Sequence, residues 1–140
     1  MNYLLDTCVV SEVVKKKPDS TVIQWLKAQN EECCFLSVLT LGELQKGISR
    51  LPDGQKKRTL QTWVDTDLRQ RFSDRILSVD TDVAEHWGEL SAQAEKVGRV
   101  VPAIDGLIAA TAVAHGLTVV TRNTKDIEPI AVSLLNPWKT

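Results

Sequence analysis

The sequence has few of the residues that stabilise secreted domains or build zinc sites. It contains 3 cysteines, an odd number, and 2 histidines among 140 residues. Cys33 and Cys34 are adjacent and Cys8 is remote from both, so the spacing provides neither a disulfide framework nor a Cys-x-x-Cys zinc motif. We therefore expect all three cysteines to be small buried apolar residues in a protein of a reducing compartment, the cytoplasm.

Long apolar runs and an excess of one charge are absent too. No segment approaches the roughly 20 apolar residues of a membrane helix, and no signal peptide is recognisable, so we expect no membrane association. The net charge of -1 argues against a strongly basic nucleic-acid binder, although it is compatible with a local basic rim. With 43% hydrophobic and 25% charged residues, the chain is typical of one globular domain, which we place at residues 1–140.

What the sequence does contain is a regular alternation of short apolar runs with helical patterns. Apolar runs without polar alternation are typical of strands that are buried on both faces of a parallel sheet. The alternation predicts a single α/β domain whose central, mostly parallel sheet of four to five strands is flanked by helices. The predicted strands are 3–5, 33–38, 76–79, 117–121 and 131–135, and the predicted helices are 7–17, 20–29, 40–50, 55–72, 81–97 and 103–115.

Two of these helices have capping residues at their predicted starts. Thr40 and Glu43 have the spacing of a capping box, in which a Ser or Thr is followed three residues later by Glu. Thr81 or Asp82 is predicted to cap the helix that runs to residue 97. The alanine-rich helix that starts at residue 103 should end at Gly116.

Acidic or amide side chains stand at four places where predicted strands end or helices begin. Asp6 follows the first strand, Glu43 lies early in the helix after the second, and Asp105 is in the first turn of the alanine-rich helix. Asn123 and Asp126 lie in the loop after the fourth strand. In a doubly wound sheet these ends share one rim. Each side chain alone can also be explained as a helix cap, a first-turn acid or a turn residue.

Together, such side chains repel one another and favour a bound cation. Two unit charges about 4 Å apart cost on the order of 4 kcal/mol at an intermediate effective dielectric. Oxygen ligands without His or Cys predict Mg²⁺ or Mn²⁺, and an ion held in this way commonly serves phosphate chemistry. Arg122, Lys125 and Lys46 stand near the acids in the sequence, and they are candidates either for contacts to substrate phosphates or for solvated surface residues.

Four segments around these acids resemble the acidic motifs of PIN domains. The segments are Leu-Leu-Asp-Thr-Cys-Val-Val-Ser-Glu, Ser-Val-Leu-Thr-Leu-Gly-Glu-Leu, Asp-Gly-Leu-Ile-Ala-Ala-Thr-Ala and Val-Thr-Arg-Asn-Thr-Lys-Asp. They resemble in particular the VapC-type toxin ribonucleases of type II toxin–antitoxin pairs, including the FitB-like branch. The similarity extends from Leu4 to Trp138 and includes the Asn-Pro-Trp near the end of the chain.

The resemblance implies a PIN-like three-layer fold and a Mg²⁺- or Mn²⁺-dependent endoribonuclease. It implies a homodimer that a small VapB-like antitoxin inhibits by covering the acidic site. Asp6 and Asp105 correspond to metal ligands, and Glu43 to a ligand of a second ion or the residue that orients the attacking water. The fourth position is open between Asn123 and Asp126, and we favour Asn123 because it lies closer to the strand end.

The same resemblance gives a role to a surplus of apolar residues on the helices between residues 20 and 50. We expect part of that surface to form a dimer contact or an antitoxin groove. The apolar residues concerned are Val22, Ile23, Leu26, Leu41 and Leu44.

Three other classes compete with this interpretation. A phosphatase of the haloacid-dehalogenase type needs a second Asp two residues after Asp6, where this chain has Cys8. A response-regulator receiver needs an acidic pair before its phosphorylated Asp, which the sequence lacks. A PIN-like interaction module without activity has no physical reason to retain mutually repelling acids, and it should bind Mn²⁺ weakly.

Overall fold

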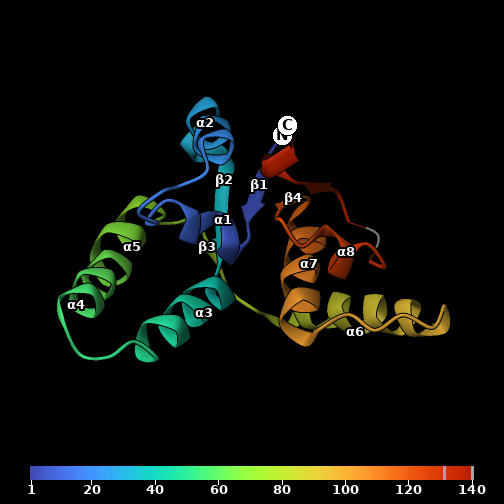
Figure 1. Ribbon diagram of the computed structural model, residues 1–140. Coiled ribbons are helices and arrows are strands. Elements are labelled where there is room, and N and C mark those ends of the chain that lie inside the picture. The colour runs from blue at the N-terminus through green and yellow to red at the C-terminus, as the bar shows by residue number, and fades with distance from the viewer. Residues whose placement is uncertain (131, 140) are drawn as a thin grey trace.

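The computed structural model describes residues 1–130 and 132–139, and its centre is one parallel sheet of five strands (Figure 1). The strand order is β3-β2-β1-β4-β5, and every neighbouring pair is parallel. This confirms the predicted α/β class and parallel sheet. The strands are shorter than predicted: β1 Tyr3–Leu5, β2 Cys34–Ser37, β3 Ile76–Leu77, β4 Thr118–Val120 and β5 Leu134–Leu135.

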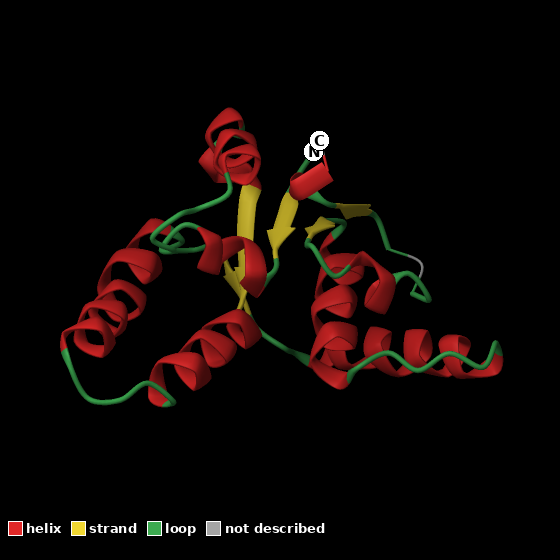
Figure 2. Cartoon of the chain, in the orientation of Figure 1, coloured by secondary structure: helices red, strands yellow, loops and turns green. Residues whose placement is uncertain are grey.

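Helices cover both faces of the sheet, which gives three layers (Figures 1 and 2). Helices α3 to α5 lie to the left of the sheet in Figure 1 and α6 to α8 to the right. No described helix has both the length and the apolar character to span a membrane. The helices are α1 Thr7–Glu12, α2 Ser20–Ala28, α3 Val38–Ser49, α4 Gln55–Thr62, α5 Arg69–Arg71, α6 Thr81–Lys96, α7 Ala103–His115 and α8 Thr124–Ile127, with short 3₁₀ turns η1 Glu31–Cys33 and η3 Pro137–Lys139 and a π-helical segment η2 Trp63–Leu68.

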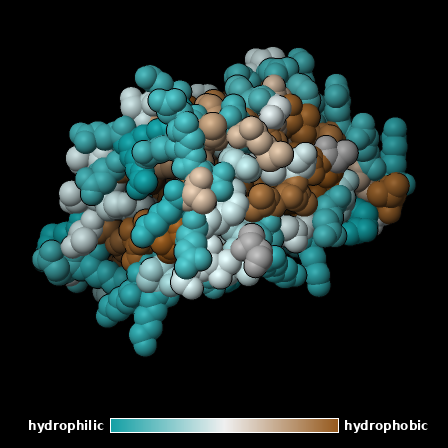
Figure 3. All heavy atoms as spheres, turned by 90° about the horizontal axis from the view of Figure 1, so that it is seen from above, coloured by the Kyte–Doolittle hydropathy of each residue, from teal (hydrophilic) through white to brown (hydrophobic). Residues whose placement is uncertain are grey.

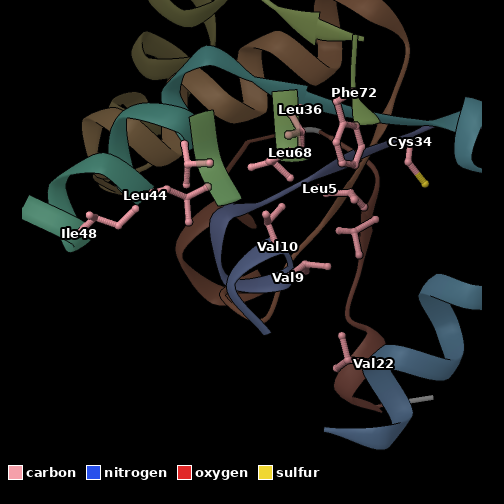
Figure 4. Close-up of a cluster of buried hydrophobic side chains, with 12 residues drawn as sticks. Leu5, Val9, Val10, Val22, Cys34, Leu36, Leu44, Ile48, Leu68 and Phe72 are labelled. Carbon is pink, nitrogen blue, oxygen red and sulfur yellow. The ribbon is translucent and has the colours of Figure 1, made fainter. Parts of the chain in front are cut away.

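Successive residues of the central strands enter different hydrophobic cores. Leu5 and Val120 belong to the core beneath α1 to α5 (Figure 4), whereas their neighbours Leu4 and Val119 belong to the core beneath α6 to α8. All four side chains are at most 4% exposed. Because side chains alternate between the faces of a strand, a run that is apolar at every position is buried on both faces.

The parallel arrangement sends several strand ends and helix starts to one edge of the sheet. Asp6 follows β1 directly, α3 begins directly after β2, and α8 follows β4 after three residues. Helix α7 runs back to β4, so its first turn, which contains Asp105, lies at the same edge. This edge is the place where open α/β sheets bind their ligands.

The first predicted helix is wrong in its length. Helix α1 ends at Glu12, not at residue 17, and the chain then turns into α2. The cause is Glu12, which is only 3% exposed. Its Oε2 accepts a hydrogen bond of 2.9 Å from the N–H of Asp19, and its Oε1 lies 2.9 Å from Nζ of Lys15. The carboxylate thus fixes the turn between the two helices.

Two predicted caps are also wrong. Helix α3 begins at Val38 and is capped by Ser37, whose Oγ accepts from the N–H of Leu39 at 3.1 Å. Helix α6 is capped by Asp80, one residue before the predicted Thr81 or Asp82. The predicted helix 55–72 is helical from Gln55 to Arg71, but its centre is the π-helical segment η2. The predicted strand 131–135 is confirmed at Leu134–Leu135, and residue 131 lies outside the described residues.

Candidate active site

Asp6 is a buried carboxylate at the centre of the sheet edge. It is 4% exposed, and its N–H donates to the carbonyl oxygen of Val120 on the neighbouring strand at 2.9 Å. Its Oδ1 accepts from the N–H of Thr7 at 2.8 Å, as expected of a residue that caps α1. Its Oδ2 accepts from the hydroxyl of Thr121 at 2.7 Å, a buried bond that helix capping does not require. Both oxygens are therefore held in fixed directions.

Glu43 is linked to this carboxylate through Thr7, whose backbone N–H donates to Asp6 and whose hydroxyl donates to Glu43. The Thr7 hydroxyl lies 2.6 Å from Oε1 of Glu43 and 3.3 Å from the hydroxyl of Thr40. Because Ser37 caps the helix, Thr40 lies inside the first turn, where it is fully buried. The capping-box explanation of Glu43 is therefore wrong. Its carboxylate lies over the sheet edge, one hydrogen-bonded side chain away from the backbone next to Asp6.

The carboxyl group of Asp105 has a raised pKa. Partial burial raises its pKa, and the negative charges of Asp6, Asp126 and Glu43 raise it further, from an ordinary 3.8 to about 6. Asp105 belongs to α7, and the three neighbouring carboxylates follow β1 or belong to α8 and α3. Each of these three lies near enough to oppose the ionisation of Asp105. Such mutual repulsion is the electrostatic sign of a site that awaits a cation.

The segment after β4 carries the two candidates for the fourth position. Asn123 is exposed and precedes α8; its backbone N–H donates to the hydroxyl of Thr121 at 3.0 Å, and its side chain makes no capping hydrogen bond. Asp126 is exposed in the first turn of α8, and its charge acts on Asp105. The backbone of Asn123 thus supports the site, whereas the side chain of Asp126 contributes to its field.

The three cations predicted to contact phosphate differ in their surroundings. Lys46 lies near the C-terminal end of α3 and Lys125 on α8, and both side chains are exposed. Arg122 is exposed as well, but its guanidinium lies 4.2 Å from the ring centroid of Trp138. Lys46 and Lys125 remain candidates for phosphate contacts, whereas Arg122 has a partner within the chain.

The donor atoms of the edge suit a hard divalent cation. They are carboxylate oxygens, the ligands that Mg²⁺ and Mn²⁺ prefer. Among the residues that the structure describes, however, no three His, Cys, Asp or Glu side chains are grouped about one point that could hold an ion. Mg²⁺ is commonly held by one or two carboxylates together with water and substrate phosphate, and it rarely has an all-protein cage. The acids fit an ion of that kind, and the predicted ligand set of three acids stays a prediction.

Three hydroxyl and thiol groups around Asp6 were not predicted. Thr7 joins Asp6 to Glu43, and Thr121 binds Asp6 directly. Cys8 is half-buried, and its Sγ lies 3.8 Å from Oδ2 of Asp6 and 3.7 Å from Oγ1 of Thr121. The sequence offers one signal for them, because Thr7 and Thr121 both follow the end of a central strand.

An apolar cleft lies beside α1 and opens onto the core beneath α1 to α5. It has a volume of about 630 Å³ and is lined by α1, α2, β2 and the helical segment from η2 to α5. Seen from above, hydrophobic atoms gather between hydrophilic side chains on the left of the molecule, where α2 and α5 lie (Figure 3). Of the apolar residues predicted to form a groove, Ile23 and Leu26 line the cleft, whereas Val22 and Leu44 are buried in the core.

Comparison with known proteins agrees with this architecture. Residues 3–131 match the family described as the PIN domain. The chain is 38% identical over 136 residues to the VapC ribonuclease Y4jK of Sinorhizobium fredii, an alignment that covers 97% of each chain. It is 38% identical over 135 residues to the toxin FitB of Neisseria gonorrhoeae, covering 96% of this chain and 97% of FitB.

Among solved structures, FitAcB from Neisseria gonorrhoeae has a TM-score of 0.95 with this chain at 37% identity, and the match covers 99% of both chains. The match to the family and the alignments to these relatives extend over nearly the whole chain. The chain belongs to the PIN domain family. This confirms the resemblance on which the expected activity rests.

Proposed function

We propose that the protein is a Mg²⁺- or Mn²⁺-dependent endoribonuclease, the cytoplasmic toxin of a toxin–antitoxin pair. Its relatives carry the names VapC ribonuclease and toxin FitB, and the alignments span this chain almost completely. The single observation that carries the proposal is Asp105, whose pKa is raised to about 6 by burial and by three neighbouring carboxylates. A helix cap or a turn residue does not require such a cluster.

The residues of the edge have distinct roles in this proposal. Asp6 and Asp105 would hold the divalent ion together with a substrate phosphate, and Glu43 would accept a proton from the attacking water. When bound, the ion supplies charge stabilisation to the phosphoryl oxygens and activates water. Thr121 and the N–H of Thr7 keep both oxygens of Asp6 in fixed directions, which limits the reorganisation needed to bind the ion.

Cleavage of a single-stranded RNA tests the activity. The purified protein should cleave with Mg²⁺ or Mn²⁺ and stop in EDTA, and Glu43→Gln should lower the rate about 100-fold, as expected for loss of a general base. Glu89→Gln, an exposed acid on α6, is the matched control and should cleave at the wild-type rate. Full cleavage in EDTA would falsify the metal mechanism.

We propose the apolar cleft as the binding site of the antitoxin. Its lining is mainly apolar, with Lys27, Glu31, Asp67 and Arg71 among its polar residues, so it suits an amphipathic helix. Helix α1 lines the cleft and has Asp6 at its N-terminus, and its 6 residues span only about 9 Å. A peptide that lies in the cleft can therefore continue across the acids with a few more residues.

Charge substitutions inside and outside the cleft test this assignment. Val13 lines the cleft and is 42% exposed, so Val13→Glu should not unfold the core. It should weaken the complex with the antitoxin by about tenfold or more, and leave RNA cleavage unchanged. Val79, 36% exposed and not part of the cleft lining, provides the control Val79→Glu. Equal effects of the two substitutions would contradict the assignment.

We also propose that the toxin is a homodimer, as the resemblance to VapC-type toxins implies. Large apolar side chains remain exposed away from the cleft, including Val97 and Val100 at 73% and 86%. Exposed aliphatic residues of this kind commonly mark a subunit contact. Sedimentation at micromolar concentration should give twice the mass of the chain, and a monomer would contradict the proposal.

A further inference from the structure

Arg122 connects the acidic edge to the last segment of the chain. It lies between Thr121, which binds Asp6, and Asn123, which precedes α8. Its guanidinium carbon lies 4.2 Å from the ring centroid of Trp138, a distance at which the cation and the ring face attract each other. A guanidinium that packs flat on an aromatic ring has less freedom to reach a substrate phosphate.

Trp138 is itself fixed by the fold. It lies in η3 and packs against the core beneath α1 to α5, and its backbone N–H donates to Oδ1 of Asn136 at 2.9 Å. The preceding strand β5 pairs with β4, and the N–H of Thr121 donates to the carbonyl oxygen of Leu135 at 3.0 Å. The indole N–H is buried and has no hydrogen-bond partner among the described residues. The ring is therefore held by packing and by Arg122, not by its own donor.

The charge of Arg122 also acts on the buried carboxylate of Glu12. Burial acts to raise the pKa of Glu12, but the N–H of Asp19, the ammonium of Lys15 and the charge of Arg122 hold it below its ordinary value. Because Glu12 also fixes the turn between α1 and α2, it is a rigid partner. This attraction adds to the contact of the guanidinium with the ring of Trp138, which is the contact that holds the side chain.

The backbone of Arg122 connects its side chain to the acidic edge through Cys8. Its N–H donates to Sγ of Cys8 at 3.5 Å, and that sulfur lies 3.8 Å from Oδ2 of Asp6. The next residue, Asn123, donates its N–H to the Thr121 hydroxyl, which donates to the same Asp6 oxygen. Fixing Arg122 thus fixes the segment that holds Asp6 on one side and carries Asp126 on the other.

We propose that Arg122 is a positioning residue, held by Trp138, that fixes the β4–α8 segment at the acidic edge, and that it does not bind substrate phosphate. The proposal rests on the proposed ribonuclease function of that edge. It replaces the expectation from the sequence that Arg122 contacts a substrate phosphate. It also gives the Asn-Pro-Trp segment a role, because Trp138 of this segment holds Arg122.

Kinetics of cleavage on one RNA separate positioning from phosphate binding. Arg122→Ala should lower kcat about tenfold and leave KM within about twofold, because the stack orders the site without touching substrate. Arg122→Lys should lose nearly as much, since an ammonium lacks the planar face of the guanidinium. Trp138→Phe should cleave at nearly the wild-type rate, because Phe keeps an aromatic face for the guanidinium. Trp138→Ala and the double variant with Arg122→Ala should match Arg122→Ala.

A second measurement follows RNA affinity against salt. With a phosphate contact, Arg122→Ala would raise KM, Arg122→Lys would restore it, and the slope of log affinity against log salt would fall by about one. That pattern overturns the proposal, and the proposal predicts an unchanged slope. Lys139→Ala removes an exposed charge next to Trp138 and should change neither kcat nor the slope.

The remaining outcomes also decide between the explanations. An inactive wild-type protein would refute the ribonuclease function, not the role of Arg122. With an active wild type, a normal kcat in Arg122→Ala, or a loss in Arg122→Ala that Trp138→Ala does not share, refutes the positioning role. If Trp138→Ala does not fold, Trp138→Phe and the two Arg122 variants carry the test, because they remove much less core packing.

Discussion

Replacing Asp105 by Asn should stabilise the metal-free protein, and only above a certain pH. The folded protein raises the pKa of Asp105 from 3.8 to about 6, so between these values the folded state binds more protons than the unfolded state. Stability therefore falls as the pH rises through this range, and the full penalty remains above pH 6. Asparagine keeps the size of the side chain and removes the charge that is responsible.

The size of the effect follows from the shift. A shift of about two units corresponds to an upper bound of about 3 kcal/mol, and solvent screening of this half-buried group reduces it to about 1–2 kcal/mol. The lost interaction of Asp105 with the N-terminal dipole of α7 offsets up to about 0.5–1 kcal/mol. The net gain should be about 1 kcal/mol at pH 7.5, or about 3–4 °C in Tm, and close to zero at pH 3.5, where the carboxyl is neutral in the folded state and mostly protonated in the unfolded state.

Thermal unfolding in EDTA between pH 3.5 and 8 measures this difference. Asp82→Asn is the control, because Asp82 also lies in the first turn of a helix, α6. Among the described residues, its carboxylate approaches one basic side chain, with Oδ1 3.5 Å from Nδ1 of His86. It should be neutral or slightly destabilising at every pH. If Asp105→Asn lowers Tm at pH 7.5, or if its effect does not change with pH, the carboxylate serves α7 and the repulsion argument is wrong.

The remaining predictions concern the groups around Asp6. Thr121→Val leaves a buried oxygen of Asp6 without its donor, so it should destabilise the protein by about 1–3 kcal/mol in urea unfolding and lower cleavage; an unchanged midpoint would show that the bond is unimportant. Asp126→Ala and Asn123→Ala, compared on one RNA at saturating Mn²⁺, decide the fourth position, and the charge of Asp126 on Asp105 predicts the larger loss for Asp126→Ala. If neither loses more than about tenfold, roughly 1.4 kcal/mol of barrier, the site works with three acids.

The fold could be predicted because its signals are local. Tyr3–Leu5 and Thr118–Val120 are apolar runs, and such runs are buried on both faces wherever they occur in a parallel sheet. The ends of elements were harder, because they depend on contacts between distant residues. Helix α1 ends at Glu12 because its carboxylate binds Asp19, and no pattern within residues 7–17 contains that information.

The acids could be predicted from their places at strand ends, but their partners could not. The Thr7 hydroxyl bonds to Glu43 across 36 positions and Thr121 bonds to Asp6 across 115, so only the folded chain brings them together. The prediction for Thr40 was wrong for a related reason, since Ser37, which ends β2, caps the helix first. The cleft is lined by residues from several separate elements, so its shape exists only in the folded chain.

Calorimetric titration of the metal-free protein with Mn²⁺ tests most directly whether the acidic edge holds an ion. The wild type should bind at pH 6 and release protons as it does so, because about half of the Asp105 carboxyl groups are still protonated near their pKa of about 6 and the ion displaces these protons. Asp105→Asn should bind at least about tenfold more weakly with less proton release, and Asp82→Asn should bind like the wild type. Binding of equal strength by Asp105→Asn, or no binding by the wild type, would contradict the account.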